Sequence, residues 1–388
     1  MAKKQKQLQG RVPIAIGTAD WHATETAWSH SKITGDSLYA VEQIVDLAHR
    51  HQVPILAAGD LFDVNRPPSH IIAEVQVQME RMRVAGLPVY FITGQHEKAR
   101  VPIAGEPVEW LHAVANPWPI AIHRTAVSLP GGITAYGINW TPALRLPDEL
   151  AAIPEGVDIL VAHQIWEQLR SGDMITPEAS LNDIPAHVRH VLTGDWHVHS
   201  TIERRRPYSD VITAWSPGSS SLMDLSESPA KFVFVIHDDL SADSVPLLSR
   251  PVIRDMVDAE SFPHYLANVM SVVTASTASC LTIPPFNPRF AVPILDVRYA
   301  DDVFNCKARI EAVVGAAAHV RDRPMPRLKA GAEVGAASRR QVSFAEAAKE
   351  LQQPDEAVDL AIALYEAVDN DFVALNQVKN EFFERNEL

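Results

Sequence analysis

The chain has 388 residues, of which 47% are hydrophobic and 21% charged, so two or three folded domains are expected. No apolar run approaches the roughly 18 residues that a membrane-spanning helix needs, so we expect no membrane span. The net charge of −14 argues against a protein that holds nucleic acid by bulk electrostatic attraction, because such proteins carry clustered lysine and arginine.

The N-terminus and the cysteines indicate the cellular compartment. Residues 1–11 are basic, but no apolar core follows them, so we expect a solvated tail rather than a secretory signal. Cys280 and Cys306 lie far apart and lack the spacing of metal ligands. That usage fits a reducing compartment, and we expect a cytoplasmic protein.

Between residues 12 and 238, short apolar runs rich in Val, Ile and Ala alternate with polar loops and helical patterns. Continuous apolar runs of this length are typical of strands buried on both faces, and the alternation predicts an α/β sandwich. Helices are predicted over 38–49 and 71–83. The later strands lie closer together, which favours antiparallel pairing there. The predicted strands are 12–16, 53–57, 88–92, 133–138, 157–161, 190–193, 211–215 and 232–236.

The character of the sequence changes after residue 238. The segment 239–335 is rich in proline and predicts a small α+β domain with one strand, 291–299, and one helix, 302–319. The charged, Gly- and Ala-rich stretch 327–340 has the composition of a linker. Apolar residues then recur at helical spacing, so 336–388 is predicted to be a C-terminal helical segment.

Five clusters of Asp, His and amide side chains each follow a predicted strand. Any one of them has an ordinary structural explanation, since a Gly-Asp pair often marks a turn and a single His is usually a hydrogen-bonded structural residue. Together, however, they place many metal-ligand types at the ends of strands of one α/β fold, where such folds bind ligands. The clusters are GTADWH at 17–22, GDLFD at 59–63, GQHE at 94–97, AHQ at 162–164 and GDWHVH at 194–199.

The order of these clusters resembles the signature of calcineurin-like metallophosphoesterases: D-x-H, G-D-x-x-D, G-N-H-D/E, a single H, then G-H-x-H. GDLFD at 59–63 is the form typical of double-strand-break repair nucleases of the SbcD or meiotic-recombination-eleven type. SPGSS at 216–220, followed by a strand, resembles a P-G-S segment of those nucleases. The resemblance implies a metallophosphoesterase β-sandwich flanked by helices over 1–238, a capping domain that recognises DNA over 239–335, and a C-terminal partner-binding segment.

The resemblance also implies roles for individual residues. Asp20, His22 and the second His of the last motif would hold one metal ion, and Asp60 would bridge to a second. The second ion would be held by the amide of the third motif, by His163 and by the first position of the last motif. His96 would face the scissile phosphate as an acid or transition-state stabiliser. The ions would be two Mn²⁺, with Mg²⁺ less effective.

The sequence departs from the family pattern at two positions. Gln95 stands where the third motif usually has Asn, and Asp195 stands at the first His of the last motif if GDWH is aligned without a gap. The ungapped register makes Asp195 and His197 ligands; the alternative register uses His197 and His199. We favour the first because the preceding strand then keeps its length. Both departures indicate a divergent member of the group, and a phage origin is one interpretation.

Three functions are compatible with these features. The first is a DNA exonuclease and endonuclease, a homodimeric subunit paired with an SbcC-type coiled-coil ATPase, in a bacterium or a phage-infected cell. The C-terminal apolar stripe fits a docking surface for that partner, although a helix pair packed on its own domain explains it equally well. The second is a phosphoesterase for small molecules or proteins, favoured mildly by the acidic charge. The third is a non-catalytic scaffold, which the intact motif residues argue against.

Overall fold

A computed structural model describes residues 10–26, 33–97, 119–169, 176–206, 210–281, 287–300 and 303–325. The chain divides into one compact unit that ends at Pro326 and a second unit, Arg327–Leu388. The second unit lies outside the described residues, and so do the expected linker and the C-terminal helical segment. Among the described residues, no helix is long and apolar enough to span a bilayer.

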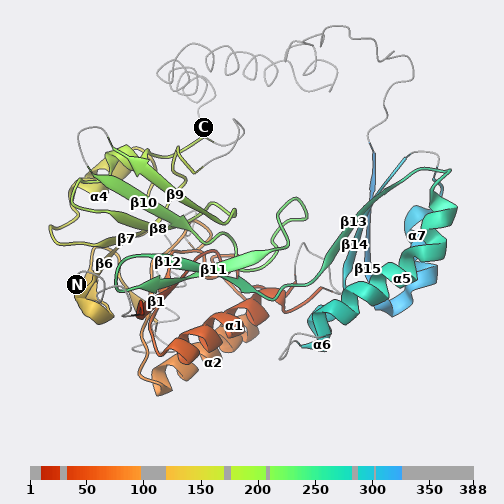
Figure 1. Ribbon diagram of the computed structural model, residues 1–388, viewed down its shortest axis with the longest axis horizontal. Coiled ribbons are helices and arrows are strands. Elements are labelled where there is room, and N and C mark those ends of the chain that lie inside the picture. Colours follow the sequence, from red (N-terminus) through yellow and green to blue (C-terminus); the bar gives the residue numbers. More distant parts are fainter. Residues whose placement is uncertain are drawn as a thin grey trace, which may run out of the picture. The chain divides into compact units, whose positions relative to one another are not determined.

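Two six-stranded sheets form the first part of the chain (Figure 1). In the first sheet, β1, β2, β3 and β4 are parallel, whereas β11 pairs antiparallel with both β1 and β12. This sheet has the order β12 (Ala242–Leu247), β11 (Lys231–His237), β1 (Pro13–Thr18), β2 (Ile55–Ala57), β3 (Val89–Phe91) and β4 (Ile120–Ala121). It therefore continues past the domain boundary expected after residue 238.

The second sheet has a parallel centre and antiparallel edges. Strands β6, β7, β8 and β10 run parallel, and β5 and β9 pair antiparallel at the two edges. The order is β5 (Ala126–Ser128), β6 (Thr134–Ile138), β7 (Ile159–His163), β8 (His190–Gly194), β10 (Val211–Ser216) and β9 (Ser200–Arg205). The later strands β9, β11 and β12 all pair antiparallel, as expected, but so does the earlier strand β5. Every strand predicted up to residue 236 is confirmed.

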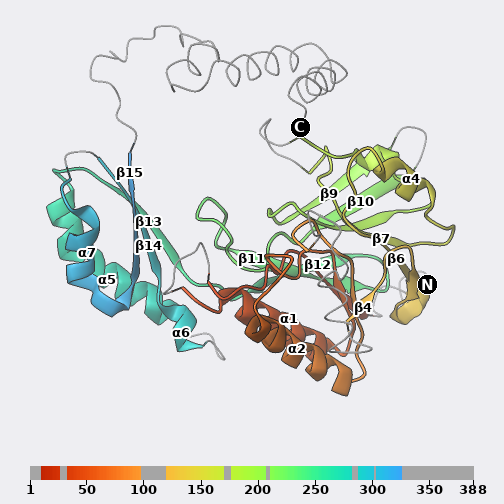
Figure 2. The same cartoon turned by 180° about the vertical axis from the view of Figure 1, so that it is seen from behind.

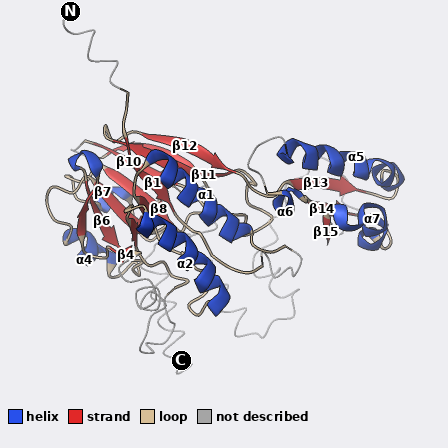
Figure 3. Cartoon of the chain, turned by 90° about the horizontal axis from the view of Figure 1, so that it is seen from below, coloured by secondary structure: helices blue, strands red, loops and turns tan. Residues whose placement is uncertain are grey.

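The inner faces of the two sheets share one apolar core, and helices cover the outer faces. The shared core contains Ile14, Leu56, Val161, Leu192 and Phe234. Figure 3 shows α1 (Asp36–His51) and α2 (Ser69–Val84) side by side across the first sheet. The outer face of the second sheet packs against α4 (Leu146–Ala151) and the loop around a one-turn helix, η3 (Leu181–Asp183). The loop around a second one-turn helix, η2 (Pro130–Gly132), packs instead at the core shared by the two sheets.

The helix α1 forms where its apolar residues recur every three or four positions. Ala40, Val41, Ile44 and Ala48 are all buried against the sheet. The helix ends at Gln52, whose left-handed backbone (φ 55°) lets its N–H bond back to the carbonyls of the last turn. Both predicted helices of the first part are confirmed.

The α+β part contains a three-stranded parallel sheet, β13 (Val252–Val257), β14 (Ile294–Tyr299) and β15 (His319–Pro324). Figure 2 shows α5 (Phe262–Leu281) and α7 (Cys306–Val314) packed beside these strands, with α6 (Pro288–Ala291) and η4 (Gly315–Ala317) as short turns. The expectation of one strand and one helix was therefore wrong. The strand 291–299 is confirmed from residue 294, but the helix 302–319 stops at Val314, where Gly315 adopts a positive φ of 53°.

The α+β part is fastened to the sandwich by two arginines that precede or lie within β13. The guanidinium of Arg250 pairs with the buried carboxylate of Asp36 and also donates to the carbonyls of Arg289 and Val292. Arg254 donates two hydrogen bonds of 2.7 Å to the carbonyls of Leu225 and Glu227.

Candidate metal centre

The residues predicted as metal ligands meet at the carboxyl ends of the parallel strands. Asp20 and His22 follow β1, Asp60 follows β2, and Gln95 and His96 follow β3. From the second sheet, His163 is the last residue of β7, whereas Asp195 and His197 follow β8. Because the two sheets pack face to face, five loops that are far apart in sequence converge on one place.

Backbone hydrogen bonds hold the first two loops against each other. The N–H groups of Asp20, His22 and Ala23 donate to the carbonyls of Gly59, Asp60 and Leu61 at 2.9–3.1 Å. The third loop is joined to the second through the buried carboxylate of Glu97, which accepts N–H bonds from Leu61, Phe62 and Gly94. Burial raises the pKa of Glu97 to about 8. The ligand side chains therefore project from a cross-linked backbone.

Four of the proposed ligand residues have left-handed backbone conformations. The φ angles are 48° at Asp20, 42° at His22, 50° at Asp60 and 73° at Asp195. Residues other than glycine adopt this region infrequently, although Asp and His are enriched there, and such strain costs about 1–3 kcal/mol and concentrates at functional sites. In this protein the strained conformations occur at residues whose side chains converge on a common point.

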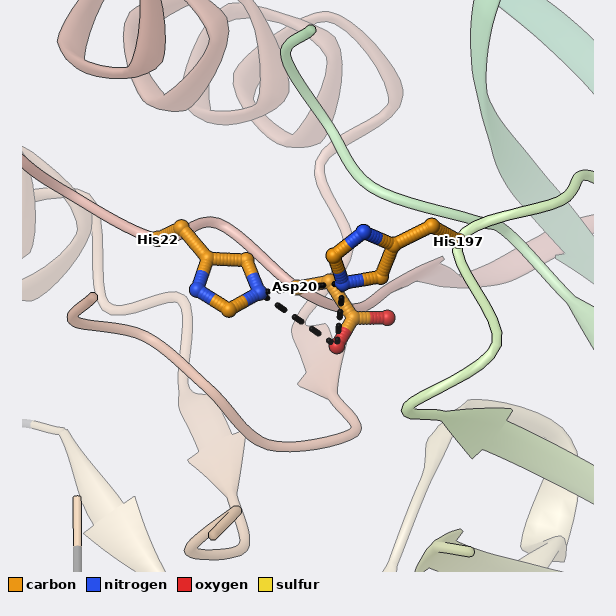
Figure 4. Close-up of side chains that lie close together, drawn as sticks. All are labelled: Asp20, His22 and His197. Carbon is orange, nitrogen blue, oxygen red and sulfur yellow. Dashed lines mark hydrogen bonds and ion pairs between the residues drawn. The ribbon is translucent and has the colours of Figure 1, made fainter. Parts of the chain in front are cut away.

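Around the first predicted metal position, Asp20, His22 and His197 converge (Figure 4). The Nε2 atoms of both histidines lie 4.0 Å from Oδ1 of Asp20 and 3.1 Å from each other. Oδ2 of Asp60 lies 3.8 Å from Nε2 of His22, which suits a carboxylate shared with a neighbouring site.

Around the second position, Asp60 and His163 approach from opposite sheets. Oδ2 of Asp60 lies 3.2 Å from Nε2 of His163. The amide of Gln95 donates from Nε2 to Oδ1 of Asp195 at 2.5 Å, and the backbone N–H of Asp195 donates to Oδ1 of Asp20 at 3.1 Å. Gly94 must lack a side chain here, because a Cβ would collide with the Asp60 carboxylate.

The atoms that would bind metal have few partners in the protein. Oδ2 of Asp20 and Oε1 of Gln95 are buried and have no hydrogen-bond partner among the described residues. Oδ2 of Asp60 and Nε2 of His163 are also buried, and they meet each other at 3.2 Å. Buried polar groups are nearly always hydrogen-bonded, so ligand-type atoms that converge on one point with so few partners fit a site that would hold a cation. The donor set of carboxylate, imidazole and amide fits a divalent metal ion.

Each ligand imidazole is oriented by an oxygen atom at its far nitrogen. Nδ1 of His163 donates to the carbonyl of Ala58 at 2.6 Å, and Nδ1 of His197 donates to the carboxylate of Glu227 at 2.8 Å. Nδ1 of His22 lies 3.2 Å from Oδ1 of Asp63. This arrangement leaves each Nε2 available as the ligand atom, as is usual for metal-binding histidines.

His96 lies at the exposed side of the cluster. Its side chain is 42% exposed, whereas those of Asp20 and His163 are fully buried. Its Nδ1 donates to the carbonyl of Asp63 at 2.8 Å, and its ring meets the edge of the His22 ring. Nδ1 of His96 also falls in a group with His22 and Asp63 that could hold a metal. However, the bond to Asp63 occupies that nitrogen, so Nε2 is the atom available to a substrate.

His199 does not join the cluster, so the register that makes it a ligand is not the one the structure forms. Its ring stacks on Phe232 and contacts Phe234, and its nitrogens bond to the Pro217 carbonyl and to Ser244. The chain bends at Asp195 and again at Val198, so the side chains of His197 and His199 need not reach the same point. His197, not His199, faces Asp20.

Asp63, Glu97, Glu227 and Lys231 contribute to the site although the sequence pattern predicted no role for them. Asp63 and Glu97 stand inside the quoted motifs, so their positions were a usable signal. Glu227 and Lys231 lie in and after the loop that follows SPGSS, and only the fold brings them to His197. No local pattern in the sequence would have identified them.

The five loops of the site lie within a region that matches a known protein family. Residues 15–199 match the family model described as calcineurin-like phosphoesterase, so this part of the chain is a calcineurin-like metallophosphoesterase domain. Among curated proteins, the chain is similar to the DNA double-strand break repair protein Mre11 of several archaea. It is 26% identical to that of Methanosarcina mazei over 198 residues, which cover 48% of this chain and 31% of that protein.

Further relatives carry the same name. The Mre11 protein of Methanosarcina acetivorans is 25% identical over 264 residues, covering 64% of this chain and 41% of that protein. The chain thus spans less than half the length of these two relatives. Among solved structures, TT1561 of Thermus thermophilus is 14% identical with a TM-score of 0.38, and the match covers 61% of this chain and 99% of that one.

Proposed function

We propose that this protein is a metal-dependent DNA nuclease, an exonuclease and endonuclease of the kind that acts in double-strand-break repair and recombination. The observation that carries the proposal is the convergence of buried carboxylate, imidazole and amide atoms at the meeting point of five loops. The similarity to Mre11 proteins supports DNA as the substrate.

The residues present fit a two-metal centre. Asp20, His22, Asp60 and His197 would hold one ion, and Asp60, Gln95, His163 and Asp195 would hold the other; Mn²⁺ is the proposed metal, with Mg²⁺ as a weaker substitute. When bound, two divalent cations supply a nucleophilic water and neutralise charge in an in-line displacement at phosphorus.

His96 has the position of a general acid or transition-state stabiliser. Its Nδ1–H is fixed by the Asp63 carbonyl, which orients the ring and leaves Nε2 for a bond to the substrate. A protonated Nε2 there can donate to a phosphate oxygen or protonate the leaving 3′ oxygen. Asp63 therefore orients two histidines at once, His96 through its carbonyl and His22 through its carboxylate.

The acidic net charge of −14 is compatible with DNA only if other surfaces contribute. We propose that the α+β part, 239–335, takes part in DNA recognition and that the C-terminal segment, 336–388, binds an SbcC-type coiled-coil ATPase within a homodimeric, cytoplasmic complex. The alternative function, a phosphoesterase for small-molecule or protein phosphates, would need none of these partners.

Cleavage assays separate these functions. The protein should degrade linear duplex DNA in Mn²⁺ and should lose that activity in EDTA. The variant Asp20→Ala is the matched control for a contaminating nuclease, because it removes a ligand of the first ion. Hydrolysis of a generic phosphodiester without cleavage of DNA would favour the alternative, and inactivity on both substrates would favour a non-catalytic scaffold.

A further inference from the structure

The loop between β10 and β11, residues 217–230, lies directly behind the first proposed metal position. The N–H of Ser220 donates to the carbonyl of Asp20 at 3.1 Å. Gly218 has a φ of 75°, and a Cβ there would come within 2.8 Å of the His197 carbonyl. One loop therefore contacts the backbone of two proposed ligands, which gives a structural reason for the SPGSS motif.

The same loop presents a carboxylate to His197. Oε1 of Glu227 accepts the Nδ1–H of His197 at 2.8 Å. The other oxygen, Oε2, accepts from Ser219 Oγ at 2.9 Å, from the Met223 N–H at 3.1 Å and from Lys231 Nζ at 2.6 Å. Four donors thus fix both oxygens of this carboxylate.

Lys231 is the least expected member of this network. Its side chain is only 3% exposed, and its Nζ also donates to Ser219 Oγ at 2.7 Å. Burying an ammonium and a carboxylate usually gains little stability over apolar residues of the same size, so the pair calls for another explanation. Here the ammonium of Lys231 balances the charge of Glu227 and holds its carboxylate in one orientation against the imidazole of His197.

We propose that Glu227 is the positioning residue for the first metal ion, that it acts through His197, and that Lys231 keeps it in place. The bond from Nδ1 fixes the proton on that nitrogen, so the lone pair of Nε2 points toward Asp20. It also fixes the angle of the ring. Carboxylates that support metal-binding histidines in this way typically change metal affinity about 10–100-fold.

The inference rests on the proposed metal-dependent function, so the readout is Mn²⁺ affinity rather than DNA cleavage. Titration calorimetry would be done with the full chain carrying Asp195→Ala, which removes a ligand of the second ion so that the first is measured. Two double variants would be compared in that background, Glu227→Gln/Lys231→Met and Glu227→Leu/Lys231→Met. Both remove the buried ion pair, but only Gln keeps an oxygen that accepts from His197.

The Leu variant should bind Mn²⁺ about 10–100-fold more weakly than the parent protein, and the Gln variant should recover most of that loss. A matched control is Asp36→Asn, which breaks the ion pair with Arg250. That pair is as buried as Glu227 with Lys231, at 12% and 3% exposure against 13% and 3%. Asp36→Asn should leave the Mn²⁺ affinity unchanged.

Equal affinity in the Leu and Gln variants, or an equal loss in Asp36→Asn, would overturn the role of Glu227. If a double variant does not fold, the tautomer of His197 decides instead. Nitrogen NMR of the metal-free protein, at a pH where the imidazole is neutral, should find the proton on Nδ1, and a proton on Nε2 would refute the proposal. Failure of the unmodified protein to bind any Mn²⁺ would count against the proposed function itself.

Discussion

The side chains of Gln95 and Asp195 are joined by a hydrogen bond of 2.5 Å, and these are the two positions at which the sequence departs from the metallophosphoesterase pattern. Where the pattern has Asn and His, this chain has the longer amide of Gln95 and the shorter side chain of Asp195. The bond aligns the Gln95 amide so that its Oε1 stays buried and unpartnered among the residues the structure describes. The two departures are therefore complementary.

This relationship predicts two Mn²⁺ sites of unequal affinity. Gln reaches roughly 1.5 Å further than Asn, whereas metal–oxygen distances tolerate about 0.2 Å of error. The site with Gln95 and Asp195 should bind more weakly than the site with Asp20 and His22, and activity should need high Mn²⁺. Calorimetric titration would check this, and two equally tight sites would show that the backbone has already adjusted to Gln95.

The complementarity itself predicts coupling between two substitutions. Gln95→Asn should narrow the gap between the two sites if the loop relaxes, because the shorter amide removes the extra reach, but it also breaks the bond to Asp195. Asp195→His restores the usual partner of Asn, so the double variant should bind Mn²⁺ at the second site more tightly than the two single changes predict. Contacting residues typically couple by about 0.5–3 kcal/mol. Simple additivity in the measured affinities would mean that the two departures are independent.

Asp60→Asn should abolish nuclease activity. Oδ2 of Asp60 faces both His22 and His163, so one substitution removes the negative charge shared by both metal positions. The conformation of the loop should not change, because the side-chain oxygen of Asn can still accept the backbone N–H of His96, which bonds to Oδ1 of Asp60 in the natural protein. Activity would be measured at saturating Mn²⁺, with circular dichroism as the control for folding. Retained cleavage would remove Asp60 from the catalytic centre.

His96→Ala should lower the rate of cleavage about 10²–10⁴-fold while Mn²⁺ uptake stays near normal. The exposed imidazole contributes no ligand atom in the proposed centre, because its Nδ1 is bonded to the Asp63 carbonyl. Rates and calorimetry would be measured on the same preparation. A large loss of Mn²⁺ uptake would show that His96 is a ligand, as its proximity to His22 and Asp63 allows.

Mn²⁺ affinity should rise with pH. Burial alone would lower the pKa of His163, but the carboxylates of Asp60 and Asp20 outweigh it and raise the pKa to about 10 in the metal-free protein. The protonated imidazole must lose its proton before Nε2 can bind a metal, so apparent affinity should increase with pH throughout the range below about 10. Calorimetry in buffers of different ionisation enthalpy would detect the released proton. Affinity independent of pH would contradict this charge state.

The same shift has a consequence for the metal-free fold. Since the folded-state pKa of His163 is raised, its ion pair with Asp60 contributes stability that is complete below the unfolded value of 6.5. That contribution is lost as pH rises through about 10. Thermal unfolding in EDTA at increasing pH would measure the loss.

The sandwich and the ligand loops were predictable because local sequence determines them. Continuous apolar runs such as the one that forms β7 are strands in any buried sheet, and His163 follows directly from where that run ends. The helix α5 was not predictable in this way. Its Val, Thr and Ser residues have low helix propensity, and packing of Phe262, Val269 and Val273 on the small sheet decides its structure.

The supporting residues of the site were beyond prediction for a related reason. The contact between His197 and Glu227 spans 30 residues and depends on the path of the loop after β10. Similarly, the stacking of His199 on Phe232 and Phe234, which excludes it from the cluster, depends on β11 lying beside it. Sequence spacing alone left both registers of the last motif open.

The most direct test is anomalous scattering from crystals soaked in Mn²⁺. Two peaks are predicted: a stronger one among Asp20, His22, Asp60 and His197, and a weaker one among Asp60, Gln95, His163 and Asp195. A single peak at the first position would mean that the second site does not fill under those conditions, whereas peaks away from Asp60, or ligation by His199, would contradict the proposed centre.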